Sequence, residues 1–459
     1  MTHKFNPTIL REYDIRGIVG DTLTEADAYA LGRTYAAFAQ GEGARTIAVG
    51  RDGRTHSGML AAELIRGLTE GGLNVMQVGM GPSPMLYFAT YHLDVDGGIQ
   101  VTGSHNPAAY NGFKMLLKGR SLFGAEIQDI GRRSASGAWS EGVGSIEEVD
   151  VRAAYVDRLL QDFSGKPFRI GWDAGNGAAG PILDMLVERL PGQHHVMFSE
   201  VDGRFPNHHP DPTVEANLAD LKGLVAREQL DFGIAFAGDG DRIGAVDAKG
   251  RVIWGDQLLM ILAEPVLKEQ PGATIIADVK ASQTLFDRVG QMGGSPLMWK
   301  TGHSLIKSKM KETGAPLAGE MSGHIFFKHR WYGFDDALYA AVRLIEAVSA
   351  SGKSLTELKD EMPRAVATPE LRFQVEESRK FAIIEEVRER LSADGAKVDA
   401  TDGVRVSTAD GWWLLRASNT QDVLVARAES AEQAGLDRLI AQIDDQLAKS
   451  GVERVEAVH

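Results

Sequence analysis

Residues 97–107 read Gly97-Gly98-Ile99-Gln100-Val101-Thr102-Gly103-Ser104-His105-Asn106-Pro107, an apolar run that ends in a small polar loop. The run predicts a buried β-strand, since short apolar segments bounded by turn residues are typical of covered strands. Gly103 allows close backbone approach, and Pro107 prevents regular structure from continuing. Ser104 is therefore displayed at a strand end, where α/β proteins tend to place their chemistry. The alternative is a turn in which Ser104 and Asn106 bond their own backbone.

Strand-like and helix-like patterns alternate on both sides of this stretch. Residues 57–70 have helical periodicity with Ser57 as the expected N-cap, and another helix is expected from Ala178. Short apolar runs predict strands at 46–50, 74–78, 97–101, 168–172, 231–236, 274–279 and 296–299. Repeated β-then-α units with Gly-rich connections predict layered α/β domains.

The C-terminal part of the chain has a different pattern. Its predicted strands are residues 371–375, 404–406 and 412–415, and its predicted helices are residues 380–391 and 431–448. This order predicts a small α+β unit. With boundaries near Glu147, Lys249 and Pro363, the predicted domains are 1–147, 148–249 and 250–363, all α/β, and 364–459, α+β.

Composition excludes several classes of function. A chain of 459 residues needs more than one core, and its net charge of -14 argues against nucleic acid or an anionic membrane as a partner. A local basic cleft can still bind an anionic small molecule. The absence of cysteine excludes disulfides and thiolate catalysis. With no signal-like start and no run of ~20 apolar residues, we expect a cytoplasmic protein without a membrane partner.

A second loop, Phe236-Ala237-Gly238-Asp239-Gly240-Asp241-Arg242, follows another apolar strand. Its two carboxylates, two residues apart among glycines, can converge on one cation. Oxygen ligands suit Mg²⁺, which often shares a substrate phosphate. The alternative is an acidic turn with solvated side chains.

Three further loops carry polar groups suited to a sugar phosphate. In Gly319-Glu320-Met321-Ser322-Gly323-His324, Glu320 and Ser322 would lie on one side of an extended segment, which is the spacing for two sugar hydroxyls. Thr301-Gly302-His303 opens a helix whose amides can face an anion. Arg416-Ala417-Ser418-Asn419-Thr420 offers a planar guanidinium with neutral donors, a good phosphate cradle. The alternatives are a surface turn, a capping or solvated histidine, and a polar turn between strands.

The loop at Thr102–Pro107, followed by Tyr110-Asn111-Gly112-Phe113-Lys114, resembles the active-site loop of the α-D-phosphohexomutases, most of all their phosphomannomutase/phosphoglucomutase branch. The Glu-Met-Ser-Gly-His form of 320–324 resembles the glucose/mannose branch, since the glucosamine branch usually has Gln in place of Met321. The resemblance covers nearly the whole chain. It implies three related α/β domains, with mixed sheets flanked by helices, and a C-terminal, TATA-binding-protein-like α+β domain around a central cleft.

The resemblance also implies roles for individual residues. Catalytic roles fall to Ser104, which carries a phosphoryl group, and to His105, Lys114, His324 and Arg16; the acid/base among His105, Lys114 and His324 stays open. Mg²⁺ is expected on Ser104, Asp239 and Asp241. The residues expected to bind substrate are Tyr13, Arg242, Lys280, Gly302, His303, Glu320, Met321, Ser322, Gly323, Arg416, Ala417, Ser418, Asn419 and Thr420.

The implied activity is interconversion of hexose 1-phosphate and hexose 6-phosphate, of glucose or mannose or both. It runs through phospho-Ser104 and a 1,6-bisphosphate, with glucose 1,6-bisphosphate as activator, in a monomer or weak dimer. One departure stands out: Ala237 occupies the place of the first aspartate in the family's Asp-Gly-Asp-Gly-Asp-Arg loop. Two alternatives remain. One is a phosphoglucosamine mutase, with the same chemistry on an amino sugar, and the other, suggested by Ala237, is a sugar-phosphate-binding variant of low activity.

Overall fold

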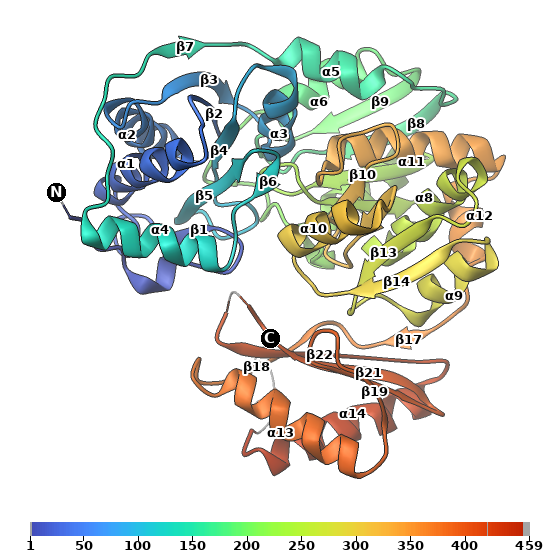
Figure 1. Ribbon diagram of the computed structural model, residues 1–459. Coiled ribbons are helices and arrows are strands. Elements are labelled where there is room, and N and C mark those ends of the chain that lie inside the picture. The colour runs from blue at the N-terminus through green and yellow to red at the C-terminus, as the bar shows by residue number, and fades with distance from the viewer. Residues whose placement is uncertain (1, 420, 453–459) are drawn as a thin grey trace.

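The computed structural model describes residues 2–419 and 421–452 (Figure 1). Within these residues the strands form four sheets that follow one another along the sequence. The predicted fold class, three mixed α/β sheets followed by an α+β unit, is confirmed. No helix in the described part of the chain has the length and apolar character needed to cross a membrane.

The first sheet has the strand order β1-β5-β4-β2-β3-β7, with β6 on β5. Its strands are β1 (Ile15–Ile18), β2 (Thr46–Arg51), β3 (Asn74–Met80), β4 (Gly97–Val101), β5 (Tyr110–Leu117), β6 (Arg120–Ser121) and β7 (Ile146–Glu148). Its helices are α1 (Glu25–Gly41), α2 (Ser57–Glu70), α3 (Ser83–His92) and α4 (Ala125–Ser136), preceded by the 3-10 turn η1 (Pro7–Ile9). Helices α1, α2 and α4 cover one face, and α3 covers the other.

One local prediction here is wrong. Ser57 is the first residue of α2 rather than its N-cap, which is His56 and makes no side-chain capping bond. The Ser57 hydroxyl instead donates to the buried Asp52 carboxylate. A tertiary partner has taken the side chain away from the helix end.

The second sheet has the order β12-β11-β10-β8-β9. Its strands are β8 (Phe168–Asp173), β9 (Gly192–Met197), β10 (Phe232–Phe236), β11 (Ile243–Asp247) and β12 (Val252–Ile253). The accompanying helices are α5 (Arg152–Leu160), α6 (Gly180–Val187), η2 (Glu215–Leu218) and α7 (Ala219–Arg227). Strands β10 and β11 are antiparallel neighbours, so the acidic loop at 237–242 is the hairpin connection between them.

The third sheet has the order β14-β13-β15-β16. Its strands are β13 (Thr274–Asp278), β14 (Ser295–Trp299), β15 (Leu317–Gly319) and β16 (Ile325–Phe327). The helices are α8 (Gly255–Glu269), α9 (Gln283–Gln291), α10 (His303–Thr313), α11 (Ala337–Ser351) and α12 (Leu355–Asp360). Because β15 and β16 are antiparallel, residues 320–324 connect a second hairpin.

The fourth sheet has the order β17-β22-β21-β20-β19, with β18 on β22. Its strands are β17 (Val366–Ala367), β18 (Leu371–Gln374), β19 (Lys397–Asp399), β20 (Val404–Thr408), β21 (Gly411–Ala417) and β22 (Val423–Ser430). Helices α13 (Lys380–Ala393) and α14 (Gln433–Lys449) pack on it. Figure 1 shows this unit, in orange and red, below the other three.

The apolar core explains this arrangement. One continuous cluster joins the first three sheets. Phe88 of α3 packs with Tyr155 of α5, and the same cluster extends to buried residues of α8 and α11. The fourth sheet has its own core, centred on Trp413 and the inner faces of α13 and α14. It meets the third sheet through a small cluster of Val279, Trp412 and Leu414.

Candidate active site

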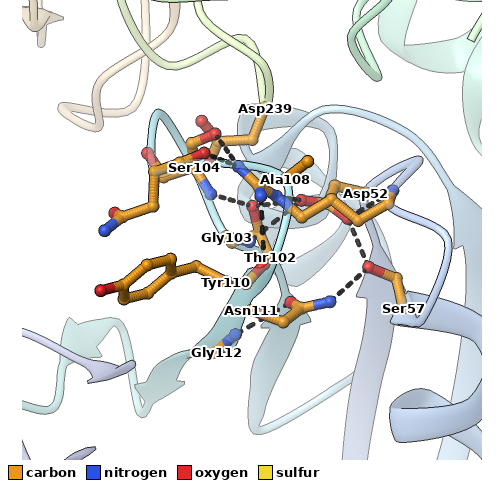
Figure 2. A network of polar contacts seen from close by, with 12 residues as sticks. Asp52, Ser57, Thr102, Gly103, Ser104, Ala108, Tyr110, Asn111, Gly112 and Asp239 are labelled. Carbon is orange, nitrogen blue, oxygen red and sulfur yellow. Dashed lines mark hydrogen bonds and ion pairs between the residues drawn. The ribbon is translucent and has the colours of Figure 1, made fainter. Parts of the chain in front are cut away.

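The Ser104 loop leaves β4 and turns sharply at the serine. Ser104 has a φ of 50°, in the left-handed region that non-glycine residues rarely adopt. Its amide donates to Thr102 Oγ1 at 2.8 Å, and Thr102 Oγ1 donates to Asp52 Oδ2 at 2.8 Å. The same Asp52 oxygen accepts from the Gly103 amide at 3.0 Å (Figure 2). Asp52 therefore fixes the backbone on the N-terminal side of the serine.

The buried Arg54 side chain fixes the other side of the loop. Its guanidinium donates to four carbonyl oxygens, those of Ser104 (2.9 Å), Asn106 (2.6 Å), Pro107 (2.6 Å) and Tyr110 (3.0 Å). Gly103 makes room for it, since a Cβ at that position would lie 2.2 Å from Arg54 Nε. Sequence reasoning missed both Asp52 and Arg54; the available signal was the charged segment Arg51-Asp52-Gly53-Arg54 directly after a predicted strand.

Two predicted residues contact this loop. Arg16 Nη1 donates to Gly103 O at 2.7 Å and to Asn106 Oδ1 at 2.8 Å. His105 Nδ1 lies 3.3 Å from Ser104 Oγ. Desolvation lowers the pKa of His105 well below its usual value, and the surrounding cations, Arg242 first among them, lower it further. These surroundings favour the neutral form of His105 next to the serine hydroxyl.

Lys114 joins the serine sheet to the acidic loop. Its Nζ lies 2.7 Å from Asp239 Oδ2 and 2.7 Å from Asp241 Oδ2, and all three side chains are buried. Desolvation opposes the charge on Lys114, but the two carboxylates raise its pKa well above the usual value. Desolvation likewise acts to raise the pKa of Asp241, and Lys114 and His324 lower it below the usual range. Lys114 and Asp241 therefore stay charged.

The acidic loop retains free ligand capacity for a cation. Asp239 Oδ1 and Asp241 Oδ1 are buried and make no hydrogen bond to any described residue. Such carboxylate oxygens are the donor type that a hard divalent ion prefers. Asp241, His324 and Asp335 also offer ligand atoms within 4.8 Å of one another. Ala237 is fully buried. Its amide donates to Arg242 O and its carbonyl accepts from the Gly240 amide, so the turn is hydrogen-bonded, but its side chain offers no oxygen to a cation.

His324 is held from both ring nitrogens. Nε2 accepts from Arg242 Nε at 3.0 Å, and Nδ1 lies 2.9 Å from Asp335 Oδ2. Asp335 in turn lies 3.3 Å from Lys307 Nζ. Burial acts to raise the pKa of Asp335, but Lys307 and His324 lower it well below the usual value. Sequence reasoning did not single out Asp335, which lies in an irregular stretch before α11.

The sugar-loop prediction needs a correction. Residues 320–323 form a tight turn rather than an extended segment, since the Gly323 amide donates to Glu320 O at 3.0 Å. Glu320 is buried, and its Oε1 accepts from the Gly302 amide at 2.6 Å, whereas Ser322 is half-buried. Desolvation raises the pKa of Glu320. The hairpin register of β15 and β16 imposes the turn, and the Met321 amide donates to Asp278 Oδ1 at 3.0 Å.

Three further predicted residues, Tyr13, His303 and Lys280, lie in the region of Thr301. Tyr13 donates to Thr301 O at 2.8 Å and accepts from Asn419 Nδ2 at 2.6 Å. His303 begins α10 and packs edge-on to Tyr13, with ring centroids 5.6 Å apart. Lys280 is not free: its Nζ lies 3.2 Å from Glu370 Oε2.

The C-terminal sheet brings its polar loop to the same place. Arg416 is buried at the end of β21, where its Nε donates to Asp402 Oδ2 at 2.9 Å. Ala417 is the last residue of the strand, and the Ser418 amide donates a hydrogen bond to Val423 O at 3.0 Å. Thr420 lies outside the described residues.

Four domain models of one protein family match successive parts of the chain. Residues 7–140, 153–250, 254–366 and 370–446 match, in order, the phosphoglucomutase/phosphomannomutase α/β/α domains I, II and III and the C-terminal domain. The chain is 46% identical over 441 residues to the phosphomannomutase/phosphoglucomutase of Pseudomonas aeruginosa, covering 96% of this chain and 95% of that protein. It is 45% identical to the phosphoglucomutase of Neisseria gonorrhoeae, with coverages of 94% and 95%. A crystal structure of a phosphoglucomutase/phosphomannomutase family protein from Burkholderia thailandensis superposes with a TM-score of 0.92 at 42% identity, covering 98% of this chain and 99% of that one.

Proposed function

The chain belongs to the phosphoglucomutase/phosphomannomutase family of isomerases, and from this premise we propose that it interconverts hexose 1-phosphate and hexose 6-phosphate through a phosphoryl group carried by Ser104. The substrates are glucose or mannose phosphates, or both, since the relatives bear phosphoglucomutase and phosphomannomutase names. Glucose 1,6-bisphosphate serves as activator because it can restore the phosphoryl group to Ser104. We also propose that the protein works as a monomer or weak dimer.

The observation that carries the proposal is the contact between the serine loop and the acidic loop. Gly238 lies against the Ser104 carbonyl so closely that a Cβ there would be 2.9 Å from Ser104 O. Lys114 then links the Asp239 and Asp241 carboxylates to the strand that follows Ser104. The loop that carries the Ser104 hydroxyl thus lies against the loop that carries the two carboxylates and their ammonium partner, which are the kinds of group that phosphoryl transfer uses.

The chemistry proceeds in two transfers. In the first, the Ser104 O–P bond breaks and a bond forms between phosphorus and the free hydroxyl oxygen of the hexose monophosphate, giving a 1,6-bisphosphate. In the second, Ser104 Oγ attacks the other phosphate, and the isomeric monophosphate leaves. Such transfers need in-line positioning and positive charge more than covalent help. We assign that charge to Lys114, Arg16 and Arg242.

Asp239 and Asp241, together with the Ser104 phosphate, would hold Mg²⁺, which supplies further charge neutralisation when bound. The hydroxyl that attacks must lose a proton to a neighbouring base. Lys114 fits this role poorly because its raised pKa keeps it protonated. His105 beside Ser104 and His324 remain the candidates, and His324 would have to release Arg242 from its Nε2 before it accepts a proton.

Sugar and distal phosphate bind away from the serine in this proposal. Glu320, Met321, Ser322 and Gly323 face the sugar, while Arg416 to Asn419, Lys280, Gly302, His303 and Tyr13 hold the phosphate that is not reacting. The contact of Tyr13 with both Thr301 and Asn419 supports a shared site. Lys280 would exchange its Glu370 partner for the phosphate.

A coupled assay tests the proposal. Glucose 1-phosphate, mannose 1-phosphate and glucosamine 1-phosphate are supplied separately, with and without Mg²⁺ and glucose 1,6-bisphosphate. We expect turnover of the first or second sugar, and its loss in Ser104→Ala but not in Ser136→Ala, an exposed serine on α4. Preference for the glucosamine phosphate would favour the alternative mutase, and unchanged activity of Ser104→Ala would reject the mechanism.

A further inference from the structure

Asp402 occupies an unusual position between the third and fourth sheets. It lies in the turn from β19 to β20, and its Oδ2 accepts two hydrogen bonds at once. One comes from Arg416 Nε at 2.9 Å and the other from the Thr301 amide at 3.0 Å. A single carboxylate oxygen therefore connects the predicted phosphate cradle to the segment that opens α10.

The backbone of the turn is built to place this oxygen. Gly403 has a φ of 80°, and a Cβ there would lie 2.3 Å from Leu415 O and 2.7 Å from the Arg416 Cα. The turn can approach β21 this closely only with glycine at 403. As a result the Asp402 side chain is 14% exposed and the Arg416 side chain 6% exposed, and the pair is largely shielded from water.

The Thr301 carbonyl is bound by a residue of the segment that precedes β1. Tyr13 donates to Thr301 O at 2.8 Å, and Asn419 donates to Tyr13 at 2.6 Å. The Tyr13 ring lies on Gly302, where a Cβ would be 2.3 Å from Tyr13 Cζ. Thr301 is thus bound through its carbonyl by Tyr13, which precedes β1, and through its amide by Asp402, which lies between β19 and β20. Asn419, which follows β21, joins the group through Tyr13.

We propose that Asp402 is a positioning residue that aims Arg416 at the distal phosphate and couples this aim to docking of the C-terminal sheet. A guanidinium whose Nε–H is bound to a carboxylate keeps its two terminal amino groups directed the other way, ready for a bidentate contact with phosphate. The same Asp402 oxygen also accepts from the Thr301 amide of the third domain. We therefore expect Asp402, and with it Arg416, to be fixed when the fourth sheet lies against the third. The inference rests on the proposed role of Arg416.

Asp402→Ala and Asp402→Asn test this proposal, with Asp399→Ala as the matched control. Asp399 is an exposed carboxylate at the start of the same turn and accepts from the Thr401 amide at 2.8 Å. For Asp402→Ala we expect KM for glucose 1-phosphate to rise about 10- to 100-fold, the effect of losing hydrogen bonds to a charged group, with kcat changed less than about threefold. Asp402→Asn, which keeps an acceptor oxygen but not the charge, should fall between.

Two measurements without turnover keep the test independent of the mutase activity. Small-angle scattering of the ligand-free protein should give a larger radius of gyration for Asp402→Ala than for wild type and Asp399→Ala. Calorimetry should show weaker binding of glucose 6-phosphate. An unchanged or lowered KM, with an unchanged radius and unchanged affinity, would overturn the proposal. A wild type that binds glucose 6-phosphate but isomerises neither glucose 1-phosphate nor mannose 1-phosphate would instead reject the proposed function.

Discussion

At position 54 one buried guanidinium serves four carbonyl oxygens of the serine loop. Arg54→Met would leave these oxygens and Asp52 without a cation in a buried place. We expect the free energy of unfolding to fall by about 3–5 kcal/mol, as when one partner of a buried ion pair is removed. We expect kcat to fall more than about 100-fold, because the serine loses its fixed geometry. Chemical denaturation and the coupled assay measure the two effects.

Arg66→Met is the control for this prediction. Arg66 lies exposed on α2 and pairs with Glu63 and Glu70 at the surface, where substitutions usually change stability by less than about 0.5 kcal/mol. Arg54→Lys should be intermediate, since an ammonium lacks the planar fork. Equal behaviour of Arg54→Met and Arg66→Met would show that the loop does not depend on the guanidinium.

Ala237 is a second position at which one residue should change a measurable property, here the affinity of the acidic loop for Mg²⁺. In Ala237→Asp a further carboxylate joins Asp239 and Asp241, so Mg²⁺ binding should strengthen by about 10- to 100-fold. The metal-free variant should be less stable than wild type, because like charges are gathered in a buried loop. Mn²⁺ binding followed by electron paramagnetic resonance, and the Mg²⁺ dependence of Tm, measure these effects. Identical Mn²⁺ affinities would mean that two aspartates suffice.

Site residues could be predicted from the sequence only where the residue types in a loop themselves suggest a chemical role. Ser104, Asp239 and Arg416 follow apolar strands, and their types suggest a role without knowledge of the fold. Asp52 acts on Ser104, and Asp402 acts on Thr301, across contacts far apart in the chain. The charged segment after a predicted strand marks Asp52 as a candidate but does not show its partners, and no comparable pattern marks Asp402, so their positioning roles appear only in the structure.

At the scale of elements, α5 and α11 meet at a buried carboxylate. Asp336 caps α11 by accepting from the Tyr339 amide at 2.9 Å, and it accepts from the Tyr155 hydroxyl of α5 at 2.7 Å. Burial raises the pKa of Asp336 from 3.8 to about 7, although these hydrogen bonds act to lower it. Because the folded-state pKa lies above the unfolded one, Asp336 favours folding fully below pH ~4, and this contribution is lost as pH rises toward 7.

Asp336→Asn removes that titration. We expect the variant to be more stable than wild type at pH 8, by at most about 4 kcal/mol, and the difference to shrink as pH falls to 5, since one pKa unit corresponds to about 1.4 kcal/mol. Urea denaturation across this pH range measures it. Asp150→Asn is the control, because Arg152 lowers the pKa of Asp150 to about 2, outside the range. Parallel curves for wild type and Asp336→Asn would contradict the prediction.

The elements themselves were largely predictable because their apolar patterns are strong. The strand at 97–101 is present as β4, and the helix at 57–70 as α2. The errors lie at element ends: Ser57 does not cap α2, and Glu320 begins a tight turn. Both depend on partners outside the segment itself, the Asp52 carboxylate in the preceding loop and the register of β15 with β16, which compete with the preference of the segment.

At the scale of the molecule, the cores divide the chain unevenly. We propose domains at 1–147, 148–249, 250–363 and 364–459. The first sheet has its own core under α1, α2 and α4, but a second cluster joins the first three domains through α3, while the last domain has a core that is separate from it. A fragment of residues 364–459 should therefore fold alone, with a cooperative thermal transition and the fluorescence of a buried Trp413. A fragment of residues 1–147 should aggregate, since α3 would expose its contacts with α5.

Residues 1–363 should keep their fold but lose mutase turnover, because Arg416 and Asn419 are absent. Circular dichroism of the three fragments and the coupled assay test this division. A fully active 1–363 fragment would show that the fourth domain is dispensable for phosphate binding.

The most direct test of the account follows the phosphoryl group itself. The protein is incubated with glucose 1,6-bisphosphate, digested, and mapped by mass spectrometry before and after addition of glucose 6-phosphate. We predict one phosphoryl group on Ser104 that disappears on addition of the sugar at a rate no slower than turnover. Turnover with no phosphoryl group on Ser104 at any time would contradict the account.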